Sequence, residues 1–164
     1  MSNREDADVV VLTEVAAGKH AHTLVAGLEL SGYEVVVPTD VSGQYRVLVA
    51  SRVGAVKPGV FTAPMQQRLV SVQVAVGEAA FDLIGVYVPS RGPANQRNVA
   101  KRLFQRALSD LLLSHADAFR CGRSIMVVAG DMNVVEPGHV PFHRVFGQWE
   151  YDFYQSFERS GLTD

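Results

Sequence analysis

The sequence predicts an α/β fold in which mixed β-sheets pack as a sandwich with helices on the outside. Short β-branched runs such as Val9–Val11 indicate strands, and longer segments with apolar residues at helical spacing indicate helices. Two expected strands are separated by only a few residues, which is typical of a hairpin and places an antiparallel pair among helix-connected strands. With 164 residues, 48% hydrophobic and 20% charged, the chain is expected to form one globular domain.

The first half of the chain is expected to contain one helix and three strands. Segments rich in β-branched and aromatic residues predict the strands, at Ala7–Thr13, Tyr33–Val37 and Tyr45–Ala50. A helix is expected from Glu14 to about Ser31, with Gly32 as its stop. Pro, Asp, Ser and Gly between residues 38 and 44 predict a turn.

The second half is expected to contain three strands and two helices. The strands are predicted at Leu69–Val76, Phe81–Val88 and Ser124–Ala129, with a turn at Gly77-Glu78 between the first two. A long helix is expected at Asn95–Phe119, and a last short helix at Glu150–Arg159. The long helix is expected to bury one apolar face, made of Val99, Leu103, Phe104, Ala107, Leu108, Leu111 and Leu112.

Composition excludes several classes of protein. The net charge of −2 is not that of a protein that coats nucleic acid, although a local basic patch could still grip a phosphate. The single cysteine, Cys121, allows neither an internal disulfide nor a Cys-based zinc site. No apolar run has the length of a membrane span, and Met1–Asp6 has no apolar leader core, so a cytoplasmic protein is expected.

Three of the expected strands end in polar groups. The first leads into Thr13 and Glu14, the second carries Tyr87 and precedes Arg91, and the third leads into Asp131 and Asn133. In α/β folds, side chains at strand ends leave the core yet stay rigidly placed, so functional sites gather there. The sequence therefore predicts a site built from these three ends.

Three segments resemble the successive signatures of the endonuclease/exonuclease/phosphatase superfamily, with the exodeoxyribonuclease III-like members closest in pattern: VVVLTEV, LIGVYVPSRG and VVAGDMN. Each motif alone has low specificity. Together they stand in the family's order and approximate spacing, each at a strand end, and the resemblance covers nearly the whole chain. It implies a metal-dependent hydrolase of phosphoester bonds.

The resemblance implies roles for four residues. Glu14 would hold Mg²⁺, or Mn²⁺, which prefers hard oxygen donors; the alternative is a first-turn helix acid capped by Thr13. Asp131 would orient or deprotonate the attacking water, and Asn133, pointing the same way in extended backbone, would hold a phosphate oxygen; the alternative is a local turn. Tyr87 would offer its hydroxyl to the phosphate or the leaving group; the alternative is a core tyrosine.

Basic residues could hold the substrate. From Leu83 to Ser109 the chain has five basic residues and no acid. Arg91 could reach a phosphate bidentately, Arg97 or Lys101 could reach the substrate backbone, and Arg68 is a weaker candidate. His139 and His143 follow Asp131 in sequence, but we interpret them as loop residues.

Some segments of the family pattern have no counterpart in the sequence. The resemblance implies an earlier strand with an Asn near the metal, and later strands with an Asp and an Asp-His pair. Residues 1–164 are therefore interpreted as a single partial domain. Missing strands would leave unpaired strand edges, which invite self-association.

Three functional hypotheses follow from these patterns. The favoured one is a phosphodiester hydrolase, with DNA as the first substrate to test and phosphoinositides or other phosphoesters as alternatives. The second is a non-catalytic fragment or pseudoenzyme that keeps the fold and binds only a metal or a partner. The third is an unrelated α/β binding domain in which the Glu14 and Asp131 motifs are coincidental.

Overall fold

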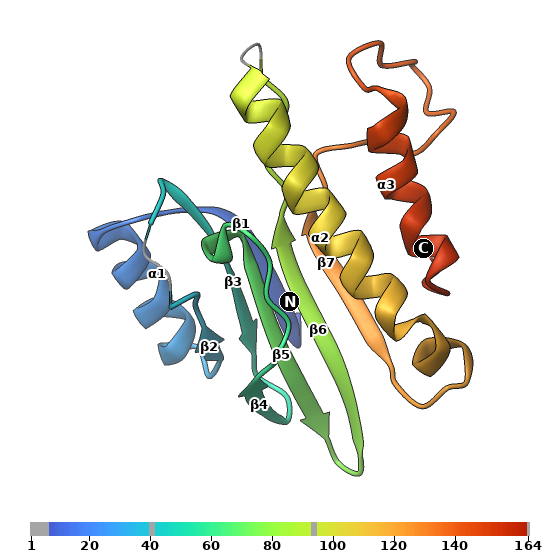
Figure 1. The fold of residues 1–164 in the computed structure, drawn as a ribbon. Helices are drawn as coiled ribbons and strands as arrows, with labels where there is room; N and C mark the ends of the chain where they lie inside the picture. The colour runs from blue at the N-terminus through green and yellow to red at the C-terminus, as the bar shows by residue number, and fades with distance from the viewer. Residues whose placement is uncertain (1–6, 40–41, 93–94, 164) are drawn as a thin grey trace.

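A computed structural model of the chain describes residues 7–39, 42–92 and 95–163. Met1–Asp6, on which the expected absence of a leader peptide rests, lies outside the described residues. The described part contains two β-sheets packed against each other, with helices on their outer sides (Figure 1). The predicted α/β sandwich is thus confirmed. No described helix has the length and apolarity needed to cross a membrane.

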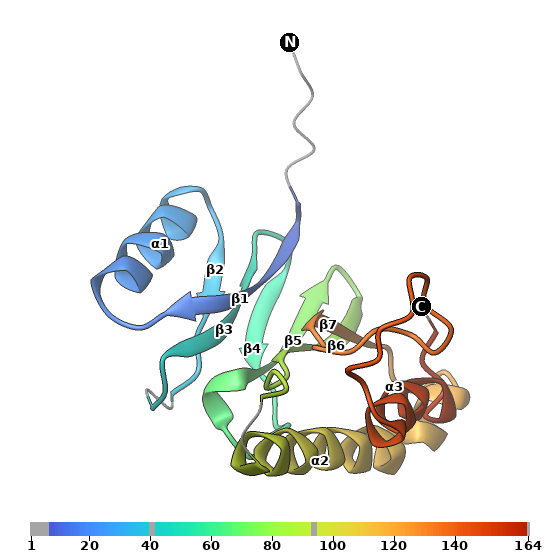
Figure 2. The ribbon, with the colours of Figure 1, turned by 90° about the horizontal axis from the view of Figure 1, so that it is seen from above.

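The first sheet is antiparallel and small. Its strands lie in the order β1 (Val9–Ala16), β3 (Tyr45–Ser51) and β2 (Glu34–Val36). Helix α1 (Lys19–Leu30) connects β1 to β2 and flanks this sheet on the side away from the second sheet (Figure 2).

The second sheet has four strands in chain order and carries two helices on its outer face. The strands are β4 (Ala55–Pro58), β5 (Leu69–Val76), β6 (Ala79–Tyr87) and β7 (Met126–Asp131). The first three are antiparallel, whereas β7 runs parallel to β6 after the long helix α2 (Asn95–Arg120). Helix α3 (Gln148–Arg159) lies beside α2, and a short 3₁₀ helix, η1 (Gln66–Arg68), precedes β5 (Figure 2).

Strand β6 separates the two hydrophobic cores because its side chains alternate between its faces. Leu83 and Tyr87 pack between the sheets, in the cluster that contains Val47, Val49, Val72 and Val74. Ile84 and Val86 point the other way, into the cluster formed with Phe104, Leu108 and Leu112 of α2. The two hydrophobic cores therefore lie on opposite faces of β6, which is buried on both sides.

The structure corrects the expected start of the first helix. Strand β1 continues through Glu14 to Ala16, because Val15 and Ala16 still pair with β3, and α1 begins only after Gly18. The helix prediction from Glu14 was therefore wrong, and so was the alternative that made Glu14 a first-turn helix acid. The φ of 98° at Gly18 is readily available to glycine and marks the boundary between strand and helix.

Two further differences concern β4 and α2. Strand β4 was not predicted, because four residues ending in Lys-Pro give a weak strand signal. On α2, Phe104 and Leu108 are buried as expected, but Val99 and Leu103 are more than half exposed. The buried stripe instead begins at Lys101, so the expectation that Lys101 reaches a substrate is wrong.

Strands β1 and β7 each form one edge of their sheet, and these two edges lie on the same side of the sandwich. Among the described strands, β1 pairs only with β3, and β7 pairs only with β6. A groove of about 660 Å³ runs between these edges, and its lining includes Val9, Val11, Phe81, Leu83, Val127 and Ala129. The inter-sheet core is thus open along one side.

A side chain at Gly85 should destabilise the sandwich. A Cβ there would lie 3.0 Å from Val49 Cγ2 and 3.2 Å from Val11 Cγ1, both on the opposite sheet. We expect Gly85→Val to lower the free energy of unfolding by about 1–3 kcal/mol through overpacking. Urea denaturation measures this change. Gly27→Ala is the matched control, because nothing lies near its Cβ and alanine favours the helix; equal effects in both variants would contradict the close sheet approach.

Candidate functional site

A β-bulge in β1 places Glu14 at the site. Between Leu12 and Val15 the register slips, so that Thr13 and Glu14 together face one residue of β3. Val9 and Val11 face the second sheet, and strict alternation would turn Glu14 away from it. The extra residue, with φ of 56° at Glu14, instead allows the carboxylate to meet a side chain of the second sheet.

That side chain is Tyr87, which links the two sheets. The Tyr87 hydroxyl donates to Glu14 Oε1 at 2.9 Å. The Arg68 guanidinium lies 4.3 Å from the centre of the Tyr87 ring, and Arg68 Nη1 donates to the Tyr87 carbonyl at 3.3 Å. Burial, and then the hydrogen bond and charge of Glu14, raise the pKa of Tyr87, while Arg68 lowers it by a smaller amount. The phenol therefore stays protonated at neutral pH and acts as a donor.

Asp131 stands at the carboxyl end of β7, in register with Tyr87 of β6. Gly130 precedes it with φ of 133°, and a Cβ there would lie 2.0 Å from the Val86 carbonyl oxygen. Only glycine allows the two strands to approach so closely at this point. The parallel pairing of β6 and β7 thus fixes the backbone that carries the Asp131 carboxylate.

Asn133 holds both oxygens of Asp131. Its backbone N–H donates to Asp131 Oδ1 at 2.8 Å, and its side-chain Nδ2 donates to Asp131 Oδ2 at 3.0 Å. The same Nδ2 donates to the Val88 carbonyl at 2.7 Å. The expected extended backbone is wrong, because Asn133 has φ of 48° and turns back on Asp131. In this arrangement Asn133 orients the carboxylate.

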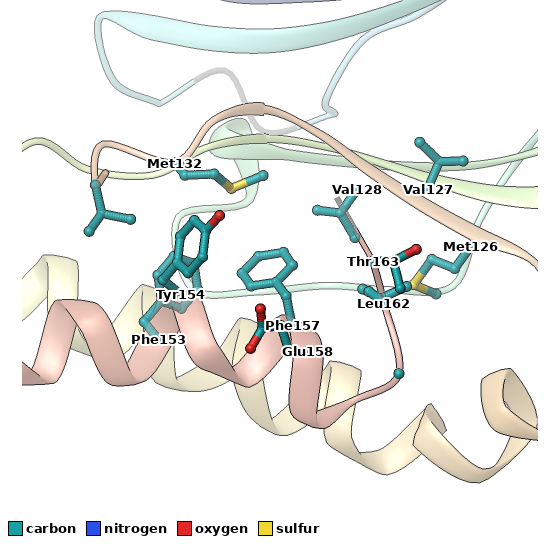
Figure 3. Close-up of a pocket in the computed structure, with 12 residues that line it drawn as sticks. Met126, Val127, Val128, Met132, Phe153, Tyr154, Phe157, Glu158, Leu162 and Thr163 are labelled. Atoms are coloured by element: carbon teal, nitrogen blue, oxygen red, sulfur yellow. The ribbon is translucent and has the colours of Figure 1, made fainter. Parts of the chain in front are cut away.

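These groups share one end of the inter-sheet groove. Thr13, Gly130 and Asp131 line the groove, whose remaining lining is apolar. Glu14 follows Thr13, and Tyr87 pairs with Asp131, so the three predicted strand ends meet here. A second cavity of about 670 Å³, between β7 and α3, is lined mostly by apolar side chains such as Met132 and Phe157 (Figure 3). The polar end of the inter-sheet groove is therefore the candidate site.

The oxygen donors suit Mg²⁺ but are few. Within the described residues, no group of three or more His, Cys, Asp or Glu side chains could enclose a metal ion. Mg²⁺ is usually held by one or two carboxylates together with waters and substrate phosphates, so it does not require such a cage. Glu14 is exposed at the bulge and has only one oxygen bonded to Tyr87. The donor chemistry thus fits a magnesium ion held by one carboxylate.

The three arginines predicted to hold substrate lie in different surroundings. Arg68 packs on Tyr87. Arg91 Nη1 donates to Glu150 Oε2 at 2.9 Å and to the Val145 carbonyl, so it bonds to the start of α3. Arg97 is exposed near the start of α2, and its side chain lies over Gly92. Only Arg68 touches the Glu14–Tyr87 pair directly.

An ionic cluster beside the site was not predicted from the sequence. Lys101 and Glu150 are both fully buried and bond to each other and, through Lys101, to the Asn133 carbonyl. The helical spacing did indicate that Lys101 is buried, because it shares one face of the helix with Phe104 and Leu108. His139 bonds Glu136 within the β7–α3 loop, in agreement with its interpretation as a loop residue.

Known structures share this fold. A 3′ phosphatase from Neisseria bound to a product DNA hairpin aligns with a TM-score of 0.71 and 21% identity, over 98% of this chain and 63% of that one. An AP endonuclease from Archaeoglobus fulgidus aligns with a TM-score of 0.69 and 24% identity, over 93% and 60%. The AP endonuclease of Leishmania major gives 0.69 and 15%, over 95% and 58%. No protein-family model and no curated protein matches the sequence.

The chain therefore has the endonuclease/exonuclease/phosphatase fold, which these phosphatase, endonuclease and exonuclease structures share. The hypothesis of an unrelated α/β domain is wrong. The chain spans about 60% of the length of each of these structures.

The Tyr87 titration tests the geometry of the Glu14 pair. Because Glu14 raises the pKa of Tyr87 and Arg68 lowers it, Glu14→Gln should lower that pKa and Arg68→Met should raise it. Phenolate absorbance during alkaline titration measures both changes, and Tyr87→Phe identifies the signal. Since the folded pKa is raised from 10.0, Tyr87 stabilises the fold fully below pH 10.0, and this contribution is lost as the pH rises through the folded pKa. An unchanged titration in Glu14→Gln would contradict the pair.

Proposed function

We propose that this chain is a Mg²⁺-dependent phosphodiesterase domain of the nuclease type, with DNA as its substrate. The observation that carries the proposal is the Asp131 carboxylate, held at both oxygens by Asn133 and placed in register with the Tyr87–Glu14 pair. A fold shared with DNA-processing enzymes supports the same reaction class. Fold alone does not decide the substrate, so the proposal rests on the site.

In the proposed reaction Asp131 is the general base. Its carboxylate accepts a proton from a water molecule, whose oxygen forms a bond to phosphorus while the bond to the leaving oxygen opposite it breaks. Asn133 keeps the carboxylate oriented. The single Tyr87 hydroxyl proton, which is bonded to Glu14 in the chain without substrate, turns instead to the phosphate or the leaving oxygen when substrate is bound. The leaving oxygen takes its proton from solvent. Each role belongs to a side chain at the polar end of the groove.

Glu14 is the proposed ligand for Mg²⁺, with Mn²⁺ as a substitute. When bound, the ion neutralises charge on the scissile phosphate. The chain's own contribution is a carboxylate aimed by the bulge and steadied by Tyr87. Arg68, Arg91 and Arg97 are proposed contacts for the phosphates, of which Arg91 and Arg97 are exposed.

A second candidate function is metal or partner binding without catalysis. A shared fold does not by itself fix an activity, so the fold that the chain has in common with these structures is compatible with this function as well. The two functions differ in whether phosphodiester bonds are broken.

Cleavage of a labelled duplex with one abasic site separates these functions. We expect cleavage with Mg²⁺ or Mn²⁺, none with EDTA, and a fall of at least about 100-fold in Asp131→Asn, because a general base contributes on that scale. Asp117→Asn is the matched control, since Asp117 is exposed near the end of α2 and pairs only locally, with Arg120. Cleavage no greater than in EDTA would favour the non-catalytic function.

We also propose that β7 pairs with β7 of a second copy. From Met126 to Gly130 the exposed edge of β7 has none of the charges or prolines that usually protect edge strands, and Ile125 and Val127 are 61% and 43% exposed. Antiparallel pairing centred on Val127 would place Ile125 opposite Ala129, so apolar side chains would meet across the two-fold axis.

Self-association should therefore depend on Val127. Light scattering over a wide concentration range should show a dimer that Val127→Lys converts to a monomer. Val60→Lys is the control, because Val60 is an exposed valine outside both edge strands. A wild-type chain that stays monomeric throughout would contradict this pairing.

A further inference from the structure

A buried ionic cluster joins α2, α3 and the loop between β7 and α3. Lys101 and Glu150 have no exposed surface. Lys101 Nζ lies 2.5 Å from Glu150 Oε1, and Glu150 Oε2 accepts from Arg91 Nη1 at 2.9 Å and from the Gly147 N–H at 2.8 Å. The two helices that carry the pair run side by side (Figures 1 and 2).

The cluster also reaches the candidate site. Lys101 Nζ donates to the Asn133 carbonyl at 2.8 Å. Asn133 then bonds both oxygens of Asp131 and the Val88 carbonyl. A continuous series of hydrogen bonds thus leads from Glu150 through Lys101 and Asn133 to the Asp131 carboxylate.

Lys101 donates a hydrogen bond to the Asn133 carbonyl, which an apolar side chain could not do. A buried ion pair between two helices can often be replaced by apolar residues without loss of stability. The Asn133 carbonyl, however, needs a donor where the chain turns back on Asp131. Asn133 stands there in the left-handed region, which asparagine adopts more readily than most residues but still at some cost. Lys101 supplies that donor from a fixed position, because Glu150 and the rings of Phe146 and Trp149 surround its ammonium group.

We propose that Lys101, held by Glu150, is a positioning residue that fixes the Asn133 peptide and thereby the orientation of Asp131. The expected effect of Lys101 on catalysis rests on the proposed function. Its structural part, the restraint of Asn133 by Lys101, holds or fails independently of activity.

The test uses Lys101→Met and two readouts below the unfolding temperature. The first is the hydrogen-exchange rate of the Asn133 amide, whose N–H is bonded to Asp131. We expect this rate to rise about 10-fold or more when Lys101 is lost, because the left-handed turn opens more often. The second is cleavage of the duplex, where kcat should fall about 10–100-fold with little change in KM, as is usual for residues that orient a catalytic group.

Two further variants distinguish positioning from general stability. Ser109→Ala is the matched control, because Ser109 and Ser156 also join α2 to α3, at 2.8 Å, away from Asp131; it should change neither readout. Lys101→Met combined with Glu150→Met should recover stability, since no buried charge is left unpaired at Lys101 or Glu150. It should not recover slow exchange at Asn133.

The exchange rate of the Asn133 amide and the cleavage assay distinguish a failure of this inference from a failure of the proposed function. Slow exchange at Asn133 in Lys101→Met, or its recovery together with stability in the double variant, would overturn the inference. If the wild-type chain cleaves no phosphodiester, the proposed function fails, and the Asn133 exchange rates alone then decide whether Lys101 restrains the Asp131 turn.

Discussion

The structure depends on one strand, β6, that is buried on both faces. Alternation sends Leu83 and Tyr87 between the sheets and Ile84 and Val86 toward α2, so the first sheet and α2 pack against opposite faces of β6. Glycine at position 85 lets the first sheet approach the strand closely. The candidate site lies at the end of β6 because its last inward side chain, Tyr87, reaches the margin of the core.

The site itself is made by local departures from regular backbone. Glu14, Gly130 and Asn133 all have positive φ, and each lies where a carboxylate must be aimed or a strand must approach. Regular strands supply rigid positions, and these three residues redirect the chain at their ends. The buried pair of Lys101 and Glu150 then supports one of the three from behind the sheet.

Sequence reasoning succeeded where local pattern and final environment agree. The hairpin of β5 and β6 and the long helix α2 follow from periodicity, and the positions of Tyr87 and Asp131 follow from strand ends. It failed where tertiary contacts decide. Glu14 looked helical because a bulge has no sequence signal of its own. Lys101 was expected to reach substrate because its buried partner lies 49 residues away on another helix. The sequence therefore predicted which residues lie at the site better than it predicted the contacts that those residues make.

The conformation of Glu14 bears on how this position would change if selection acted on folding alone. A glutamate in the left-handed region costs about 1–2 kcal/mol, whereas glycine or asparagine adopts the same backbone at lower cost. Mutational drift under selection for folding alone would therefore tend to replace this residue early. Backbone strain disfavours a glutamate at position 14, and its hydrogen bond to Tyr87 favours one. The residue found there in natural variants of this fold therefore indicates whether selection has kept the Glu14–Tyr87 pair or only the backbone.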